Sequence, residues 1–301
     1  MRAMLPEGSR NAGFTRWLAL SIAVLLPAIG AYAGLGCDRV KASASTSSSR
    51  YVSLSPAITA TLVAIGAGHQ LVGVSDYCHF AVNVGDIPRV GGATTPRFEA
   101  IVGLSPSVLF VEAFNATIVS QLAPAVRIEA LPWLTLDEVI ASTRKMGSLS
   151  GHSQSADELA SAYETTLKPR VNPNSPRVLL VMAHVPGAFK EVVFIRKNSI
   201  HGRVLEAAGA RNGVDEEVTF APRLSLEQVI VRDPDGIVIL QSAPEADRGL
   251  LEDWRSLSVL RAVKTNQITI IAANDVAIPG PSLLELLKRL ASIVGPWKKA
   301  A

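Results

Sequence analysis

The residues of this chain that are best suited to bind a metal or a polar ligand form the run Tyr77-Cys78-His79. A thiolate and an imidazole together suit soft or borderline metals such as zinc or cobalt. A structural zinc site needs four ligands, however, and no third ligand follows at a spacing typical of one. The sequence therefore predicts neither a metal site nor a cofactor, although Cys78 or His79 can still contact a metal that a ligand carries.

The other histidines follow no metal-binding spacing. They are His69, His152, His184 and His201. We expect His69 and His152 to be solvated, whereas His184 and His201 lie where they can reach a ligand.

Patterns that indicate catalysis are missing from the sequence. It contains no G-x-S-x-G nucleophile turn, no phosphate-binding loop and no closely spaced cysteine pair. Gly66-Ala67-Gly68 resembles part of a dinucleotide-binding loop, but it ends a predicted helix instead of following a strand, and the third glycine is absent. We therefore expect a protein that is not an enzyme.

Short apolar strands alternate with helices along most of the chain. The first strand, at 51–54, runs into Ser55-Pro56, and proline suits the first turn of a helix because it needs no hydrogen-bonded N–H there. Further strands are expected at 71–74, 108–111, 126–131, 178–182, 192–195, 236–240 and 268–272. Helices are expected at 116–122, 136–149, 153–171, 199–208 and 283–294. This alternation predicts an α/β fold with parallel sheets.

One strand–helix step occurs twice. Glu99 and Glu227 each open a short helix, a proline follows seven residues later, and an apolar strand begins just after it. Such a repeat predicts two lobes of similar build. The expected boundaries are 50–151 for the N-terminal lobe, 152–172 for a linking helix and 173–301 for the C-terminal lobe.

Residues 1–36 have the features of an export signal. Arg2, Arg10 and Arg16 form its positive part, an apolar stretch covers 17–26, and Ala31-Tyr32-Ala33 is a small-x-small cleavage site. The signal predicts that the folded part acts outside the cytoplasm, on the periplasmic or cell-surface side.

A lipid anchor is expected at Cys37. Leu35-Gly36-Cys37 resembles the lipobox of bacterial lipoproteins, and residues 37–49 form a serine-rich, flexible tether behind it. Simple secretion is the second alternative, and an uncleaved apolar membrane anchor is the third.

Composition limits the class of protein further. The chain has 301 residues, which is enough for two domains of ordinary size. Its formal net charge of +3 gives no basic excess, so a nucleic-acid-binding surface is not expected. Its only cysteines are Cys37 and Cys78, and because one lies in the leader, a disulfide scaffold is excluded.

Four phrases together resemble the substrate-binding proteins of bacterial ABC importers for vitamin B12, iron–siderophores and haem. The phrases are RYVSLSPAITATLVAIGAGHQLVGVSDYCHF, RVGGATTPRFEAIVGLSPSVLF, SIHGRVLEAAGARN and LSLEQVIVRDPDGIVIL, and the resemblance covers residues 50–296. It implies two Rossmann-like lobes joined by one long helix, with the ligand held in the cleft between them. It also implies an ABC permease and its ATPase as partners.

The resemblance implies a corrinoid, a vitamin B12-like compound, as the ligand. An iron–siderophore is the alternative, and haem ranks below it. A non-transport enzyme or sensor on the same scaffold also remains open, because a fold does not fix a function.

Ligands of parallel α/β sheets bind beyond the carboxyl ends of the strands. Most of the residues expected to contact the ligand lie at such ends; they are Ser55, Pro56, Tyr77, Cys78, His79, Glu112, His184, Phe220 and Asp275. The resemblance singles out Tyr77, because the vitamin B12 binders place a tyrosine just after the second strand. Tryptophans that those binders carry elsewhere are replaced here by Ala93 and Glu112.

Glu99 and Glu227 correspond, by the same resemblance, to two surface glutamates that dock to arginines of the permease. A glutamate in a first helical turn also stabilises its helix, by roughly 0.3–1 kcal/mol, which is the alternative role. Their matched positions in two lobes favour docking. We expect a monomer that engages the permease through both.

Overall fold

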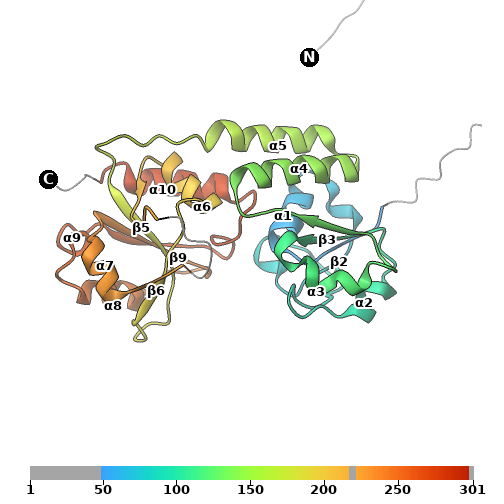
Figure 1. Ribbon diagram of the computed structural model, residues 1–301, viewed down its shortest axis with the longest axis horizontal. Helices are drawn as coiled ribbons and strands as arrows, with labels where there is room; N and C mark the ends of the chain where they lie inside the picture. The colour runs from blue at the N-terminus through green and yellow to red at the C-terminus, as the bar shows by residue number, and fades with distance from the viewer. Residues whose placement is uncertain (1–48, 217–221, 298–301) are drawn as a thin grey trace, which may run out of the picture. The chain divides into compact units, whose positions relative to one another are not determined.

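The computed structural model describes residues 49–216 and 222–297, which belong to one compact unit of the chain. The predicted export signal, Cys37 and Phe220 lie outside the described residues. The fold is α/β with two parallel sheets, as the strand–helix alternation predicts (Figure 1).

The first sheet has the strand order β2-β1-β3-β4, and all its pairs are parallel. Its strands are β1 (Tyr51–Ser53), β2 (Leu71–Val74), β3 (Val108–Glu112) and β4 (Ile128–Leu131). The helices of this lobe are α1 (Pro56–Ala64), α2 (Phe98–Gly103), α3 (Ala116–Val119) and α4 (Leu136–Ser150). Short 3-10 turns complete it: η1 (Ala67–Gln70), η2 (Cys78–Phe80), η3 (Ala113–Asn115) and η4 (Ser120–Leu122).

The second sheet has the order β10-β9-β5-β7 and is also parallel. Its strands are β5 (Arg177–Met182), β7 (Arg211–Asn212), β9 (Gly236–Gln241) and β10 (Ile268–Ala272). A separate antiparallel pair is formed by β6 (Glu191–Val193), which follows β5 in the sequence, and β8 (Arg223–Ser225), which precedes β9. The helices are α6 (Ile200–Ala207), α7 (Leu226–Arg232), α8 (Arg248–Ser256), α9 (Arg261–Lys264) and α10 (Leu283–Val294).

Local sequence sets where these helices begin and end. Thr135 and Glu138 form the predicted capping box of α4, in which each side chain bonds the other residue's backbone amide. Gly151 ends the same helix in the left-handed conformation, with φ 78°, which glycine adopts without steric cost.

The internal repeat is confirmed by the topology. In each lobe the first strand has the second strand on one side and the third and fourth strands on the other. The helices α2 and α7 precede the third strand of their lobes. Each is followed by a residue of positive φ, Ser105 or Asp233, six positions after its glutamate and one before its proline.

The helix α5 (Ser153–Thr166) packs against α4 and leads to the second sheet. Its contact with α4 is close, since a side-chain carbon added at Gly147 would lie 2.2 Å from the Ala156 Cβ. The helix is shorter than the predicted span of 152–172. Pro169 explains its end at Thr166, because proline disfavours the helical conformation at the residue before it.

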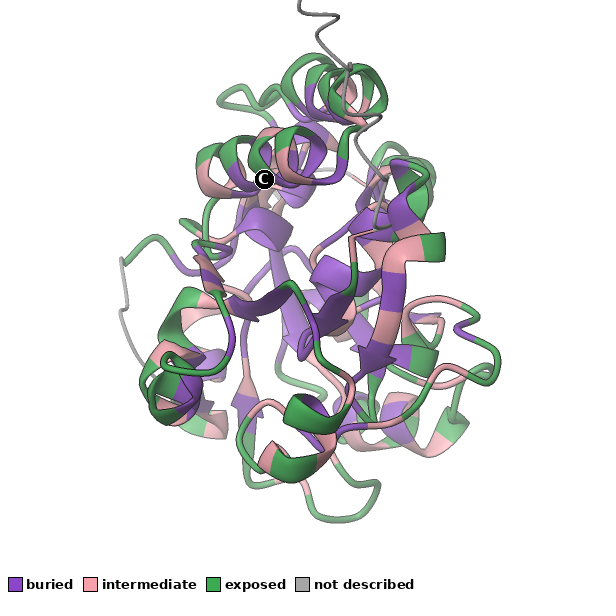
Figure 2. Cartoon of the chain, turned by 90° about the vertical axis from the view of Figure 1, so that its right-hand side faces the viewer, coloured by how far each residue is buried: buried purple, intermediate pink, exposed green. Residues whose placement is uncertain are grey.

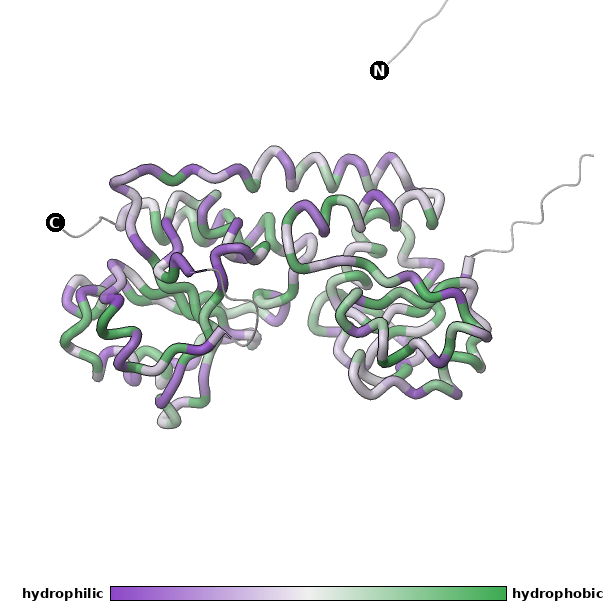
Figure 3. The backbone as a smooth tube through the Cα atoms, in the orientation of Figure 1, coloured by the Kyte–Doolittle hydropathy of each residue, from purple (hydrophilic) through white to green (hydrophobic). Residues whose placement is uncertain are grey.

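Both faces of each sheet are buried, so successive strand residues enter different cores. In β9, Val238 lies in a core shared by both lobes, whereas Ile237 lies in a core on the other face of the sheet. Phe110 and Leu109 divide in the same way in β3. Parallel strands covered on both faces are apolar almost throughout. Figure 2 shows buried strand residues in purple, and in Figure 3 the hydrophobic stretches of the backbone are coloured green.

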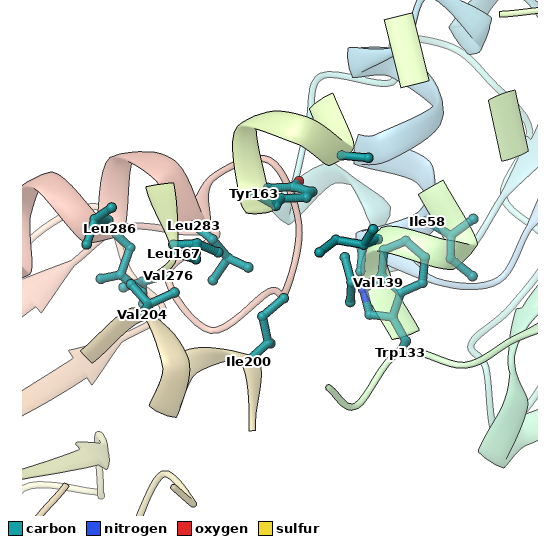
Figure 4. Close-up of a cluster of buried hydrophobic side chains, with 14 of the residues drawn as sticks. Ile58, Trp133, Val139, Tyr163, Leu167, Ile200, Val204, Val276, Leu283 and Leu286 are labelled. Carbon is teal, nitrogen blue, oxygen red and sulfur yellow. The ribbon is translucent and has the colours of Figure 1, made fainter. Parts of the chain in front are cut away.

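The shared core joins the two lobes. Its members include Ile58, Trp133, Val139, Tyr163, Leu167, Ile200, Val204, Val276, Leu283 and Leu286 (Figure 4). The indole N–H of Trp133 also donates a hydrogen bond to the Pro279 carbonyl at 2.6 Å, which connects β4's end to the segment before α10.

His201 gives this junction a pH-dependent stability. Its buried ring lies 3.2 Å from the Val276 carbonyl, and burial lowers its pKa from 6.5 to about 4. The unfolded chain therefore binds more protons between these values, and the free energy of unfolding should fall as the pH drops from 6.5 to about 4. The full loss is on the order of 3 kcal/mol.

Urea unfolding of the wild type and of His201→Gln, at about pH 7 and about pH 5, measures this effect. The variant should lose most of the pH dependence, whereas His69→Gln, which changes an exposed histidine, should keep it. Equal pH dependence in the wild type and His201→Gln would contradict the assignment.

Candidate ligand-binding site

A serine–glutamate pair lies at the carboxyl ends of the two central strands of the first sheet. The Ser55 hydroxyl donates a hydrogen bond to Glu112 Oε1 at 2.5 Å and accepts one from the Ile58 amide at 3.3 Å. Burial raises the pKa of Glu112 above its usual value, and the Ser55 bond offsets part of that rise. The pair is therefore a poorly hydrated polar centre at the strand ends, next to Pro56, the first residue of α1.

Asn115 adds an amide to this end of the sheet. It follows β3 by three residues and is only 8 % exposed. It precedes α3 but makes no capping hydrogen bond, and its side-chain amide has no hydrogen-bond partner within the described residues. Because an amide can both donate and accept hydrogen bonds, Asn115 is suited to a polar ligand.

Exposed aromatic rings follow two strands of the same sheet. Tyr77 and Phe80, after β2, are 59 % and 42 % exposed, and Phe114, after β3, is 63 % exposed. The Tyr77 ring lies against Gly92, where an added side-chain carbon would lie 3.2 Å from Tyr77 Cε2. The rings of His79 and Phe80 lie 4.0 Å apart. The strands β2 and β3, which these rings follow, both pair with β1 in the same parallel sheet.

Two further strands end in exposed apolar side chains. Leu134 follows β4 and is 49 % exposed, and Val185 follows β5 and is 71 % exposed. These two strands belong to different sheets, one in each lobe. Exposed apolar side chains after buried strands are candidates for the apolar part of a ligand site, which combines apolar walls with a few polar groups. The sequence analysis did not single out Phe80, Phe114, Leu134 or Val185. Each of these four residues can be recognised in the sequence as a large apolar residue shortly after a buried strand.

Cys78 does not have the predicted role. Its side chain is fully buried in the shared core, with Sγ 3.1 Å from Thr59 Oγ1 and 3.2 Å from Ser75 Oγ. The 3-10 turn η2 directs Cys78 inward while its neighbours His79 and Phe80 remain exposed. Cys78 is therefore a core residue and has no surface with which to contact a ligand.

His184 lies at the end of β5, where it was predicted, but it is held by the protein. Its Nε2 lies 2.9 Å from Asp253 Oδ2, which also accepts a hydrogen bond from the Gly187 amide. These two bonds lower the pKa of Asp253, and the His184 ring stacks on Phe189 at 4.4 Å. His184 thus fixes the loop after β5 against α8. His201, which was also expected to reach a ligand, is instead buried: it belongs to α6, and its ring faces the Val276 carbonyl.

Asp275 lines two grooves beside α10. A groove of about 240 Å³ has Ala60 and Val63 of α1 on one side and Asp275 and Pro281 on the other. A smaller hollow of about 100 Å³ places Asp275 near Arg289. Neither groove is lined by Ser55, Tyr77, Glu112 or His184, although the groove beside α1 also includes Ala81 and Val82, which follow η2.

Residues 49–216 and 222–297 contain no group of three or more acidic, cysteine or histidine side chains arranged to hold a metal ion. They also contain no helix with the length and apolar character needed to cross a membrane.

Comparison with known proteins assigns the family. Residues 52–274, about three quarters of the chain, match the family described as "Periplasmic binding protein". The chain belongs to that family. The two-lobed fold of related periplasmic binding proteins agrees with the two parallel sheets seen in this chain.

Individual relatives of this periplasmic binding protein have different ligands in their names. A "Cobalamin-binding protein" of Halobacterium salinarum is 26 % identical over 261 residues, which cover 81 % of this chain and 68 % of that protein. A periplasmic haem-binding protein of Pseudomonas aeruginosa has a TM-score of 0.68 at 25 % identity, over 84 % of this chain and 95 % of that one. The periplasmic vitamin B12-binding protein of Vibrio cholerae has a TM-score of 0.66 at 21 % identity, over 82 % and 96 %, and shows the shared fold.

The two predicted docking glutamates occupy equivalent, exposed positions in this periplasmic binding protein. Glu99 and Glu227 are each the second residue of their helix, α2 and α7. Hydrogen bonds from Ser225 and from the residue's own backbone lower the pKa of Glu227. Its carboxylate is therefore charged at neutral pH and available to a basic partner.

Proposed function

We propose that this periplasmic binding protein captures a corrinoid at the strand ends, in the cleft between its lobes, and delivers it to an ABC permease driven by an ATPase. The observation that carries the proposal is the set of exposed rings, Tyr77, Phe80 and Phe114, which follow strands of the sheet whose central strands end in the polar pair of Ser55 and Glu112. Aromatic faces suit a flat macrocycle, because each ring buries a large area against it. Phe114 supplies an aromatic face after the third strand, where the sequence analysis noted only Glu112.

An iron–siderophore is the alternative ligand, and haem follows it. The haem-binding relative of Pseudomonas aeruginosa keeps this alternative open. Against haem, the hairpin of Ala93, Thr94 and Thr95 beside Tyr77 offers no tyrosine as an axial ligand. A non-transport enzyme or sensor on the same scaffold would be recognised by turnover of the ligand.

The proposal includes the route to the membrane. Glu99 and Glu227 dock a monomer to the two halves of the permease, and Cys37 carries a lipid that anchors the chain. The Ser-rich tether of residues 37–49 separates that anchor from the folded part. Several acyl chains together give stable attachment, whereas one chain binds only marginally.

Native mass spectrometry of the purified protein tests the ligand class. Cobalamin, a ferric hydroxamate siderophore and haem are each added at equal concentration. We expect a one-to-one complex with cobalamin that survives competition by the other two. A complex with the iron chelate or haem alone would replace the corrinoid with that ligand, and consumption of a ligand would support the enzyme alternative.

A further inference from the structure

The carboxylate of Glu112 has only one of its two oxygens engaged. Oε1 accepts the Ser55 hydroxyl, whereas Oε2 has no hydrogen-bond partner within the described residues. The Ser55 hydroxyl has no second proton to donate, because its single hydrogen is already used. Oε2 is therefore a half-buried acceptor that only a donor from outside the protein can satisfy.

No positive side chain compensates Glu112. The part of the chain that the structure describes gives it no ion pair, and its pKa is set by burial and by Ser55 alone. Arg97, the N-cap residue of α2, pairs with Asp76 at 3.1 Å and donates to the Arg89 carbonyl at 2.7 Å. Arg89 in turn donates to the Ser75 carbonyl at 3.4 Å, so both arginines bond partners other than Glu112.

The positive end of α1 is also already occupied. Ser55 is the N-cap of α1, and Glu112 bonds its side chain. The carboxylate of Glu112 thus lies at the helix end that would otherwise attract an anionic ligand. A second carboxylate here would meet a like charge in a poorly hydrated place.

We propose that Glu112, positioned by Ser55 and assisted by the Asn115 amide, selects ligands whose edge carries neutral amide or hydroxyl donors and rejects ligands whose edge carries carboxylates. An amide N–H or a hydroxyl donates to Glu112 Oε2, and the Asn115 amide accepts or donates a second bond. A carboxylate on the ligand would instead be repelled by the charge of Glu112, which no cationic side chain among the described residues offsets. The inference rests on the proposed function, since it assumes that the ligand occupies the aromatic site beside this centre.

Two corrinoids that differ only at the ring edge test the selection. One is cobinamide, whose edge carries amides, and the other is the same corrinoid with those amides hydrolysed to carboxylates. Calorimetry should show that the wild type binds the amide form at least about tenfold more tightly, the factor that corresponds to one hydrogen bond to a charged group. Glu112→Gln should bind the carboxylate form more tightly than the wild type does and so reduce this preference to about threefold or less.

Controls separate selection from folding and from the proposed function. Glu112→Gln keeps an acceptor for Ser55, and a thermal melt reports whether this variant folds. The matched control is Glu129→Gln, which changes a carboxylate near the start of β4 that pairs with Arg127 and Lys145. It should keep the wild-type preference. Equal binding of both corrinoids by the wild type, or an unchanged preference in Glu112→Gln, would overturn the inference and leave corrinoid binding intact. Failure of both corrinoids to bind would overturn the proposed function and the inference together.

Discussion

Ligand uptake should be almost abolished in the double variant Glu99→Ala/Glu227→Ala, while the purified variant keeps its ligand affinity. Each glutamate is exposed in the second position of an equivalent helix, so its removal leaves the core and the strand ends unchanged. On docking, each carboxylate would pair with an arginine that loses water at the interface. Removing one partner of such a pair lowers affinity by roughly 30- to 3,000-fold, largely because the other charge stays unpaired.

Uptake into cells and complex formation with the permease in detergent measure this effect. The control is Glu158→Ala/Glu252→Ala, which removes two exposed carboxylates from α5 and α8. The control should transport normally. Unimpaired uptake by the Glu99/Glu227 double variant would show that both are ordinary first-turn glutamates, which matter only through the helix dipole.

Ligand affinity should fall by at least about 100-fold in Tyr77→Ala/Phe114→Ala. Both rings are more than half exposed, so their removal costs the folded protein little. Burying each ring against a flat ligand contributes roughly 1.5–3 kcal/mol, or about 10- to 150-fold in affinity, and the two rings follow different strands. Losses at separate sites usually add.

A binding titration and a thermal melt of the same variant separate affinity from stability. Val259→Ala is the matched control, because it shortens a side chain that is 52 % exposed between α8 and α9. An affinity loss below about threefold in the double variant would contradict an aromatic grip on the ligand.

The fold could be predicted well from the sequence because its signals are local. Strands that are buried on both faces appear in the sequence as continuous apolar runs. The capping box of Thr135 and Glu138 marks the start of α4, and Gly151 marks its end. The helix α5 ends earlier than predicted, because Pro169 follows it closely. The strand β8 (Arg223–Ser225) was missed because its three residues carry no pattern of their own and depend on pairing with β6.

The site could be predicted only in part, since exposure depends on the direction of short turns. Ser55, Tyr77 and Glu112 lie at the carboxyl edge of the first sheet, as predicted from the ends of the expected strands. Within η2, however, the turn buries Cys78 and exposes Phe80, and no sequence period distinguishes the two. The partners of His184 are equally nonlocal, because Asp253 is 69 residues further along the chain.

Titration of the purified protein with cobalamin is the decisive measurement of corrinoid capture. We expect saturable heat with one-to-one stoichiometry, together with a rise in Tm that grows with ligand concentration, because ligand binds only the folded state. The heat should be weak or absent in Tyr77→Ala/Phe114→Ala. No heat and no rise in Tm for the wild type at high micromolar cobalamin would contradict corrinoid capture at the strand ends.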